Sequence, residues 1–147
     1  GCYACVVEVD RQTGAVDILD YVVVDDCGTV INPLLAEGQV HGGVAQGISQ
    51  ALYEAVSFDE SGTITTGNLT SYLLPSAADL PSYTSGRVTT FCPNNILGAK
   101  GIGESGAVGA PPAVVNAVVD ALEPFGVEHL DMPLTPERVW LAMNEKG

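Results

Sequence analysis

The stretch of sequence that decides the fold runs from residue 32 to residue 56 and is NPLLAEGQVHGGVAQGISQALYEAV. Asn32 is a residue type that caps helix N-termini, and Pro33 suits the first helical position because proline has no N–H to donate there. Apolar side chains then recur at the spacing of one helix face. They are Val40, Val44, Ile48, Ala51, Leu52 and Ala55. The pattern predicts a helix over 32–56 with this face in a core.

Glycines are unusually frequent inside this predicted helix. They are Gly38, Gly42, Gly43 and Gly47. Each glycine costs about 1 kcal/mol relative to alanine in a helix interior, so a close approach by another backbone or by a ligand must compensate for it. Gln39, Gln46 and Gln50 interleave with the glycines and share one helix face. Two interpretations stay open, a face that binds an uncharged ligand and a helix packed tightly against a neighbour.

The flanking sequence predicts an α+β fold. Residues 2–10 and 15–27 are rich in Val, Ile, Cys and Tyr and are separated by a short polar turn, which predicts a β-hairpin. A further strand is expected over 86–91. Pro111 and Pro112 favour the start of a second helix that runs to about residue 123, and its nearly continuous apolar surface predicts that it is buried. A third helix is predicted over 135–145.

Composition and charge exclude several classes of protein. The 147 residues are 46% hydrophobic and 16% charged, which is enough apolar material for a core. A net charge of −13 disfavours nucleic acids and anionic membranes as partners. Neither a long apolar run nor a signal peptide is visible, so we expect a cytoplasmic location. Because residues 1–10 already have a strand pattern without a start methionine, the chain is expected to be a piece of a longer protein.

The cysteines do not form a convincing metal site in the sequence. Cys2 and Cys5 have CxxC spacing, but no second pair of ligands follows at a usable distance. Because side chains alternate between the faces of a strand, these two thiols are expected to lie on opposite faces. We therefore expect free thiols rather than a metal ligand pair.

The most informative segment outside the first helix is GAKGIGESGAVG, residues 98–109. Its five glycines can present backbone N–H groups to an anion. The GxGxxG pattern within it lacks the strand, the directly following helix and the downstream acid of a dinucleotide fingerprint, and Lys100 does not fit a P-loop. What remains is Glu104 on a glycine-rich loop beside Ile102. A partly desolvated glutamate there would be a suitable general base, whereas an ordinary solvated surface glutamate is the alternative.

Several ordered blocks resemble the large subunits of molybdenum hydroxylases, the family of xanthine dehydrogenase, aldehyde oxidase and carbon-monoxide-dehydrogenase-like enzymes. The blocks are Asp26-Cys27-Gly28 with Ile31-Asn32-Pro33, Glu37-Gly38-Gln39 with Gly42-Gly43 and Gln46-Gly47, Pro93-Asn94-Asn95, residues 98–104, and residues 131–138. They span nearly the whole chain. The resemblance implies that residues 1–147 are the C-terminal segment of a molybdenum-cofactor-binding domain, with a mixed sheet, a Gly-rich helix, a buried apolar helix and a C-terminal helix.

The resemblance also implies a site. Glu104 would be the catalytic base, and Gln39 would lie near molybdenum without binding it directly. The implied cofactor-binding residues are Gln39, Gly42, Gly43, Gln46, Lys100, Gly101, Ile102, Gly103 and Ser105. The implied cofactor is molybdenum–molybdopterin in its cytosine dinucleotide form, with iron–sulfur clusters and FAD on partner subunits or domains.

The implied reaction is oxidation of an aldehyde, an N-heterocycle or a similar small molecule with oxygen taken from water. The first and third blocks are more similar to the bacterial aldehyde and carbon-monoxide-dehydrogenase-like branch than to xanthine dehydrogenases. Family large subunits are several times longer, so the chain is expected to need the remainder of the subunit and to be inactive alone. The alternative is an orphan noncatalytic fragment that acts as a binding or assembly module.

Overall fold

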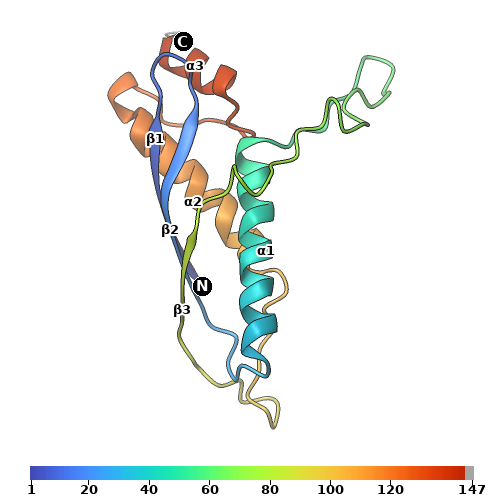
Figure 1. Cartoon of the computed structure of the whole chain (residues 1–147), viewed down its shortest axis with the longest axis vertical. Helices are drawn as coiled ribbons and strands as arrows, with labels where there is room; N and C mark the ends of the chain where they lie inside the picture. Colours follow the sequence, from blue (N-terminus) through green and yellow to red (C-terminus); the bar gives the residue numbers. More distant parts are fainter. Residues whose placement is uncertain (145–147) are drawn as a thin grey trace.

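The computed structural model describes residues 1–144 and has the predicted α+β fold (Figure 1). Its elements are β1 (Cys2–Val9), β2 (Val16–Asp25), α1 (Pro33–Leu52), β3 (Tyr83–Arg87), α2 (Ser105–Leu122), the short 3-10 helix η1 (Glu123–Phe125) and α3 (Pro136–Asn144). The sheet has the order β1-β2-β3. Strand β2 pairs antiparallel with β1 and parallel with β3, so the sheet is mixed.

The core lies where the two long helices meet the sheet. Helix α1 runs along the long axis of the molecule, and α2 crosses and contacts both α1 and β1 (Figure 1). Side chains alternate along β1 and β2, so each strand turns one row inward. The fully buried side chains come from β2, both helices and the C-terminal segment. They include Tyr21, Val23, Val44, Ile48, Val114, Val118, Leu134 and Val139.

Glycine lets α1 and α2 approach each other closely. A Cβ on Gly43 would lie 2.9 Å from the backbone nitrogen of Ala107. A Cβ on Gly106 would lie 2.7 Å from the carbonyl oxygen of Val40. Neither contact leaves room for a side chain, because the obstructing atoms belong to backbone. The tight-packing interpretation is therefore confirmed for Gly43.

The other glycines of α1 divide between the same two interpretations. Gly47 belongs to the helix contact, since a Cβ there would lie 2.6 Å from the Cβ of Ala110. Gly38 and Gly42 would place a Cβ within 4 Å of nothing. Packing inside this chain therefore does not explain why these two positions are glycine.

Three predicted boundaries are wrong. Helix α2 begins at Ser105 rather than at Pro111, because Gly106 and the residues after it pack on α1 and make the first turns helical. That contact offsets the cost of proline inside a helix. Helix α1 ends at Leu52 rather than at 56. Strand β3 lies over 83–87 instead of 86–91, because it is defined by parallel pairing with β2 that begins at Tyr21 and Tyr83.

The burial of helix α2 differs from one face to another. It is buried along one face, as predicted from its apolar residues, whereas Val108 on another face is 72% exposed. Residues 105–125 are long and apolar enough to span a membrane by length and composition alone. Their contacts with α1 and β1 are those of a core helix instead.

The remaining predicted elements are confirmed. Asn32 caps α1, with its side-chain oxygen accepting a hydrogen bond from the nitrogen of Leu35 at 3.2 Å. The predicted hairpin is β1 and β2, and Cys2 and Cys5 lie on opposite faces of β1 as free thiols. The last helix is α3, although the predicted end at Glu145 lies outside the described residues.

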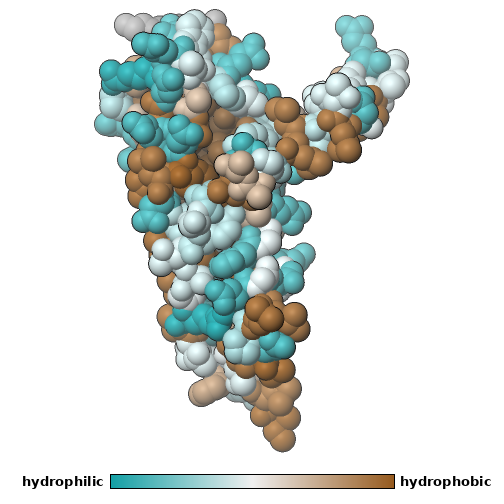
Figure 2. Space-filling view, in the orientation of Figure 1, coloured by the Kyte–Doolittle hydropathy of each residue, from teal (hydrophilic) through white to brown (hydrophobic). Residues whose placement is uncertain are grey.

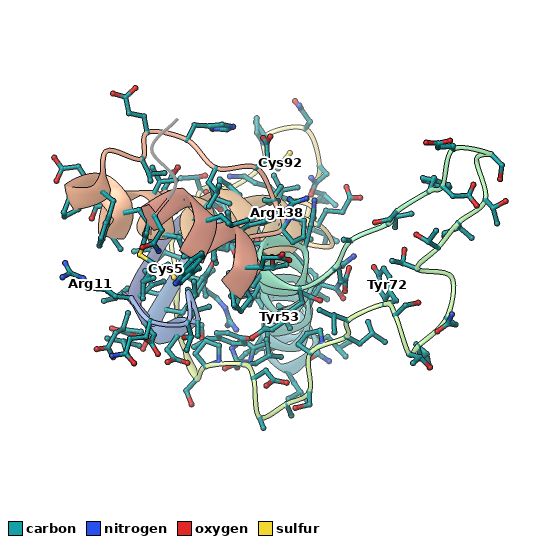
Figure 3. All side chains as sticks on the ribbon, turned by 90° about the horizontal axis from the view of Figure 1, so that it is seen from above. Cys5, Arg11, Tyr53, Tyr72, Cys92 and Arg138 are labelled. Atoms are coloured by element: carbon teal, nitrogen blue, oxygen red, sulfur yellow. The ribbon has the colours of Figure 1, made fainter. Side chains whose placement is uncertain are left out.

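Part of the segment between α1 and β3 forms an arm that projects from the body of the molecule (Figures 1 and 3). Its base is held by Tyr72, whose hydroxyl donates to Glu54 at 2.8 Å. Several of its apolar side chains are exposed. They are Phe58, Ile64, Leu69, Leu73 and Leu74. Figure 2 shows further apolar surface at the lower end of the body, where α1 begins.

The helix contact generates a stability prediction. Gly43→Ala should lower the free energy of unfolding by about 1–3 kcal/mol, because the new methyl group must displace backbone of α2. Gly42→Ala is the matched control. It should raise the free energy of unfolding by about 0.5–1 kcal/mol, because its methyl group meets nothing. Urea denaturation followed by circular dichroism measures both, and equal effects would contradict the contact.

Candidate functional site

The loop that ends at Glu104 is fixed to the body of the molecule at its beginning. The carbonyl oxygen of Gly98 accepts hydrogen bonds from the backbone nitrogens of Thr29 at 3.2 Å and Cys92 at 3.0 Å. The backbone nitrogen of Lys100 donates to the carbonyl oxygen of Cys27 at 2.8 Å. Residues 98–100 are thus held beside the segment that follows β2.

Gly28 is required for that close approach. Its backbone φ is +63°, a conformation that residues other than glycine rarely adopt. A Cβ on Gly28 would also lie 2.1 Å from the carbonyl oxygen of Gly98. The Asp-Cys-Gly block therefore has a structural reason to end in glycine.

A hydrogen bond joins the glutamine-bearing face of α1 to the loop that ends at Glu104. The side-chain amide of Gln39 donates to the carbonyl oxygen of Gly103 at 3.0 Å, across 64 residues of sequence. Helix α2 starts two residues after Gly103, so the same contact lies next to Glu104. Two segments that the family resemblance assigned to one site are adjacent in the structure.

Glu104 occupies the N-cap position of α2. Its side chain makes no capping hydrogen bond, and it is exposed in the described part of the chain. The predicted partial desolvation is therefore absent from this chain taken by itself. The neighbouring Ser105 is half-buried, and its hydroxyl donates to the carbonyl oxygen of Ile102 at 3.2 Å.

Open glycine positions surround the contact between Gln39 and the loop. Gly42 on α1 and Gly101 and Gly103 on the loop would each place a Cβ within 4 Å of nothing, and none has a positive φ. Neither packing nor backbone conformation in this chain requires glycine there. Bare backbone at these positions suits a bound group that comes closer than a Cβ would allow. The residues present fit a cofactor on this face.

Two further residues of the predicted site on α1, Gln46 and Gly43, differ in their exposure to solvent. Gln46 is exposed on the same face of α1 as Gln39. Gly43, in contrast, is buried against α2. Its direct contribution to this chain is therefore helix packing.

A pocket of about 410 Å³ lies on the side of the loop where α1 begins. Gln39, Lys100 and Gly103 contribute polar groups to its wall, and Ile31 and Leu35 contribute apolar surface. Small-molecule pockets in proteins are commonly of this size and have this mixture of apolar walls and few polar groups.

The charge of Lys100 is compensated by Asp26. The ammonium nitrogen of Lys100 lies 2.8 Å from Asp26 Oδ2, and the hydroxyl of Thr90 hydrogen-bonds to both groups. The Lys100 hydrogen bond, followed by that from the Thr90 hydroxyl, holds the pKa of Asp26 well below its usual range. Sequence reasoning missed Thr90, because no local pattern links it to Asp26, which lies 64 residues earlier.

Sequence reasoning also missed a buried polar pair under the start of α2. The hydroxyl of Tyr3 donates to the carboxylate of Asp25 at 2.9 Å, and Asp25 is 5% exposed. Burial and the bond to Asp25 raise the pKa of Tyr3 to about 12. A Cβ on Gly109 would lie 2.4 Å from the Tyr3 ring, so the pair is packed directly against α2.

Known proteins are similar to this chain in sequence and in fold. Residues 1–81 match the family described as molybdopterin cofactor-binding domain. The carbon monoxide dehydrogenase large chain of Hydrogenophaga pseudoflava is 43% identical over 99% of this chain and 18% of that protein. The nicotine 6-hydroxylase large subunit of Paenarthrobacter nicotinovorans is 42% identical over 95% of this chain and 17% of that protein.

Solved structures agree with the sequence relatives. Quinoline 2-oxidoreductase from Pseudomonas putida 86 matches with a TM-score of 0.94 and 42% identity, over 99% of this chain and 18% of that chain. The Cu,Mo-CO dehydrogenase matches with a TM-score of 0.92 and 36% identity, over 95% of this chain and 18% of that chain. The chain therefore spans less than a fifth of the length of the curated relatives it matches. The predicted family is confirmed, and the chain belongs to the molybdopterin cofactor-binding domain family of the molybdenum hydroxylases.

Proposed function

We propose that the chain is the C-terminal segment of the molybdenum-cofactor-binding domain of a molybdenum hydroxylase large subunit, and that Glu104 is its catalytic base. The observation that carries this proposal is the hydrogen bond between Gln39 and Gly103. This bond holds the face of α1 that carries Gln39 and Gly42 next to the loop that ends at Glu104. A cofactor and a base at this position could act on the same substrate.

Both α1 and the loop offer groups that would hold the cofactor. Backbone N–H groups at Gly101 and Gly103 suit the phosphates of a molybdopterin dinucleotide, for which we propose the cytosine form. On α1, Gly42 leaves room and Gln46 offers an amide, while Gln39 lies nearest to the expected place of molybdenum. Neutral donors of this kind can hold an anion without adding a buried positive charge. Ile102 and Ser105 are the remaining proposed contacts with the cofactor, whereas Gly43 and Lys100 belong to the site by positioning α1 against α2 and the beginning of the loop.

The proposed reaction oxidises an aldehyde, an N-heterocycle or a similar small molecule. When bound, the molybdenum cofactor supplies a centre that accepts electrons while oxygen derived from water is added to the substrate. Glu104 would take up the proton that this oxygen loses, at one of its carboxylate oxygens. Its side chain accepts no capping hydrogen bond, so both oxygens are available for that proton.

The remainder of the large subunit is needed to complete this site. Glu104 is exposed in the described residues, and the pocket beside Gln39 is open. Segments outside this chain would cover both and exclude water from the carboxylate. Iron–sulfur and flavin subunits or domains would then receive the electrons. We propose that the chain alone has no activity.

Replacement of the base gives a direct test in the full-length subunit assembled with its partners. Glu104→Gln should lower turnover by about 10²–10⁴-fold, because the amide keeps the shape of the side chain but cannot accept the proton. Steady-state kinetics, normalised to molybdenum content, measures the effect. Glu123→Gln, which changes an exposed glutamate in η1, is the matched control and should leave turnover unchanged. Unchanged turnover in Glu104→Gln would remove the base assignment.

The open glycines give a second test. Gly42→Ala should reduce the molybdenum and pterin content of the purified full-length subunit, because the new methyl group would occupy space assigned to the cofactor. The same substitution is expected to stabilise the 147-residue chain, so a loss of cofactor could not be attributed to unfolding. Full cofactor content in Gly42→Ala would show that the cofactor lies elsewhere and would favour a noncatalytic binding or assembly module.

A further inference from the structure

We propose that Asp26 is a positioning residue for Glu104, because it fixes the beginning of the loop on which the glutamate lies. Asp26 belongs to the segment after β2, whereas Glu104 begins α2, and the two are linked through Lys100. The inference rests on the proposed role of Glu104 as the base.

One carboxylate connects three segments of the chain. Asp26 Oδ1 accepts hydrogen bonds from the backbone nitrogen of Gly28 at 2.9 Å and of Thr90 at 3.2 Å. Asp26 Oδ2 accepts from the ammonium of Lys100 at 2.8 Å and from the hydroxyl of Thr90. The end of β2, the segment after β3 and the Glu104 loop therefore meet at Asp26.

The strength of this contact comes from its several hydrogen bonds rather than from burial. The side chain of Asp26 is 24% exposed and that of Lys100 is 33% exposed, so the ion pair by itself would contribute little. Thr90 adds a second point of attachment, because its hydroxyl contacts both Asp26 and Lys100. Three mutually bonded groups hold a more defined geometry than an isolated ion pair.

The sequence between Lys100 and Glu104 explains why this attachment matters. Gly101 and Gly103 have no neighbour that restrains them through a Cβ, and glycine backbone is the most flexible. Beyond Lys100, Ile102 packs against the hydrophobic core, and the side chain of Gln39 on α1 donates to the carbonyl oxygen of Gly103. If the Lys100 side chain were released, the backbone bond from Lys100 to Cys27 would remain, but this short glycine segment would be less restrained. A displacement of about 1 Å at a reacting group can cost about 10²-fold in rate.

The hydrogen bonds of the Lys100 ammonium also limit its availability to a bound cofactor. Its ammonium donates to Asp26 and Thr90, although the residue lines the pocket. On this inference its main contribution to the site is the position of the loop. Direct neutralisation of a cofactor phosphate by this ammonium is the competing role.

The test uses the full-length subunit assembled with its partners and two substitutions at Thr90. Thr90→Val removes the hydroxyl while keeping the shape, and Thr90→Ser keeps the hydroxyl. In Thr90→Val, amide hydrogen exchange at residues 98–104 should be on the order of tenfold faster. Its kcat should fall about tenfold to hundredfold with KM and molybdenum content unchanged. Thr90→Ser should restore exchange and kcat.

Asp26→Asn should show the same changes more strongly, and Asp20→Asn, at an exposed position on β2, is the matched control. If Asp26→Asn does not fold, the Thr90 pair still decides. Unchanged exchange at residues 98–104 in Thr90→Val, or a Thr90→Ser variant as impaired as Thr90→Val, would overturn the inference. Loss of molybdenum with an unchanged kcat per molybdenum would overturn it in favour of cofactor binding by Lys100.

Failure of the proposed function would look different. Full turnover in Glu104→Gln would remove the assignment of Glu104 as the base. That conclusion would hold whether or not Thr90→Val showed faster amide hydrogen exchange in the loop. If Glu104→Gln abolished turnover and loosening of the loop left kcat unchanged, only the positioning role of Asp26 would be lost.

Discussion

The close contact between α1 and α2 is the constraint on which the rest of the structure depends. Gly43 and Gly106 bring the two backbones together without intervening side chains, and this fixes where the first turn of α2 lies relative to α1. Glu104 immediately precedes that turn, and Gln39 lies one helical turn before Gly43. The geometry of the candidate site is therefore a consequence of helix packing, and the hydrogen bond from Gln39 to the loop follows from it.

Glycine has two separate uses in this chain, which explains why a single helix contains so many. Gly43 and Gly47 allow the helix contact, and their cost in helix propensity is offset by apolar burial between α1 and α2. Gly42 and the loop glycines instead leave space that nothing in the chain fills. Destabilising residues whose cost is not repaid by packing are typical of functional sites. The second group therefore indicates where a bound group would lie.

Local signals in the sequence predicted some of the structure well and other parts poorly. The start of α1 at Pro33 was predictable because capping by Asn32 involves only neighbouring residues. The start of α2 at Ser105 was not, since its first turn depends on contact with α1 and the prolines suggested a later start. Glu104 and Gln39 could be assigned to one site only through resemblance to a family. Asp26 and Thr90 meet across 64 residues, so spacing alone could not pair them.

We propose that this chain supplies one wall of a molybdenum cofactor site that other segments complete. The most direct measurement is the molybdenum and pterin content of the purified chain, expressed alone and together with the missing part of a related large subunit, in a host that makes the cofactor. The account predicts that cofactor is retained only in the combined sample. Absence of cofactor from both samples would contradict it and would favour a noncatalytic assembly module.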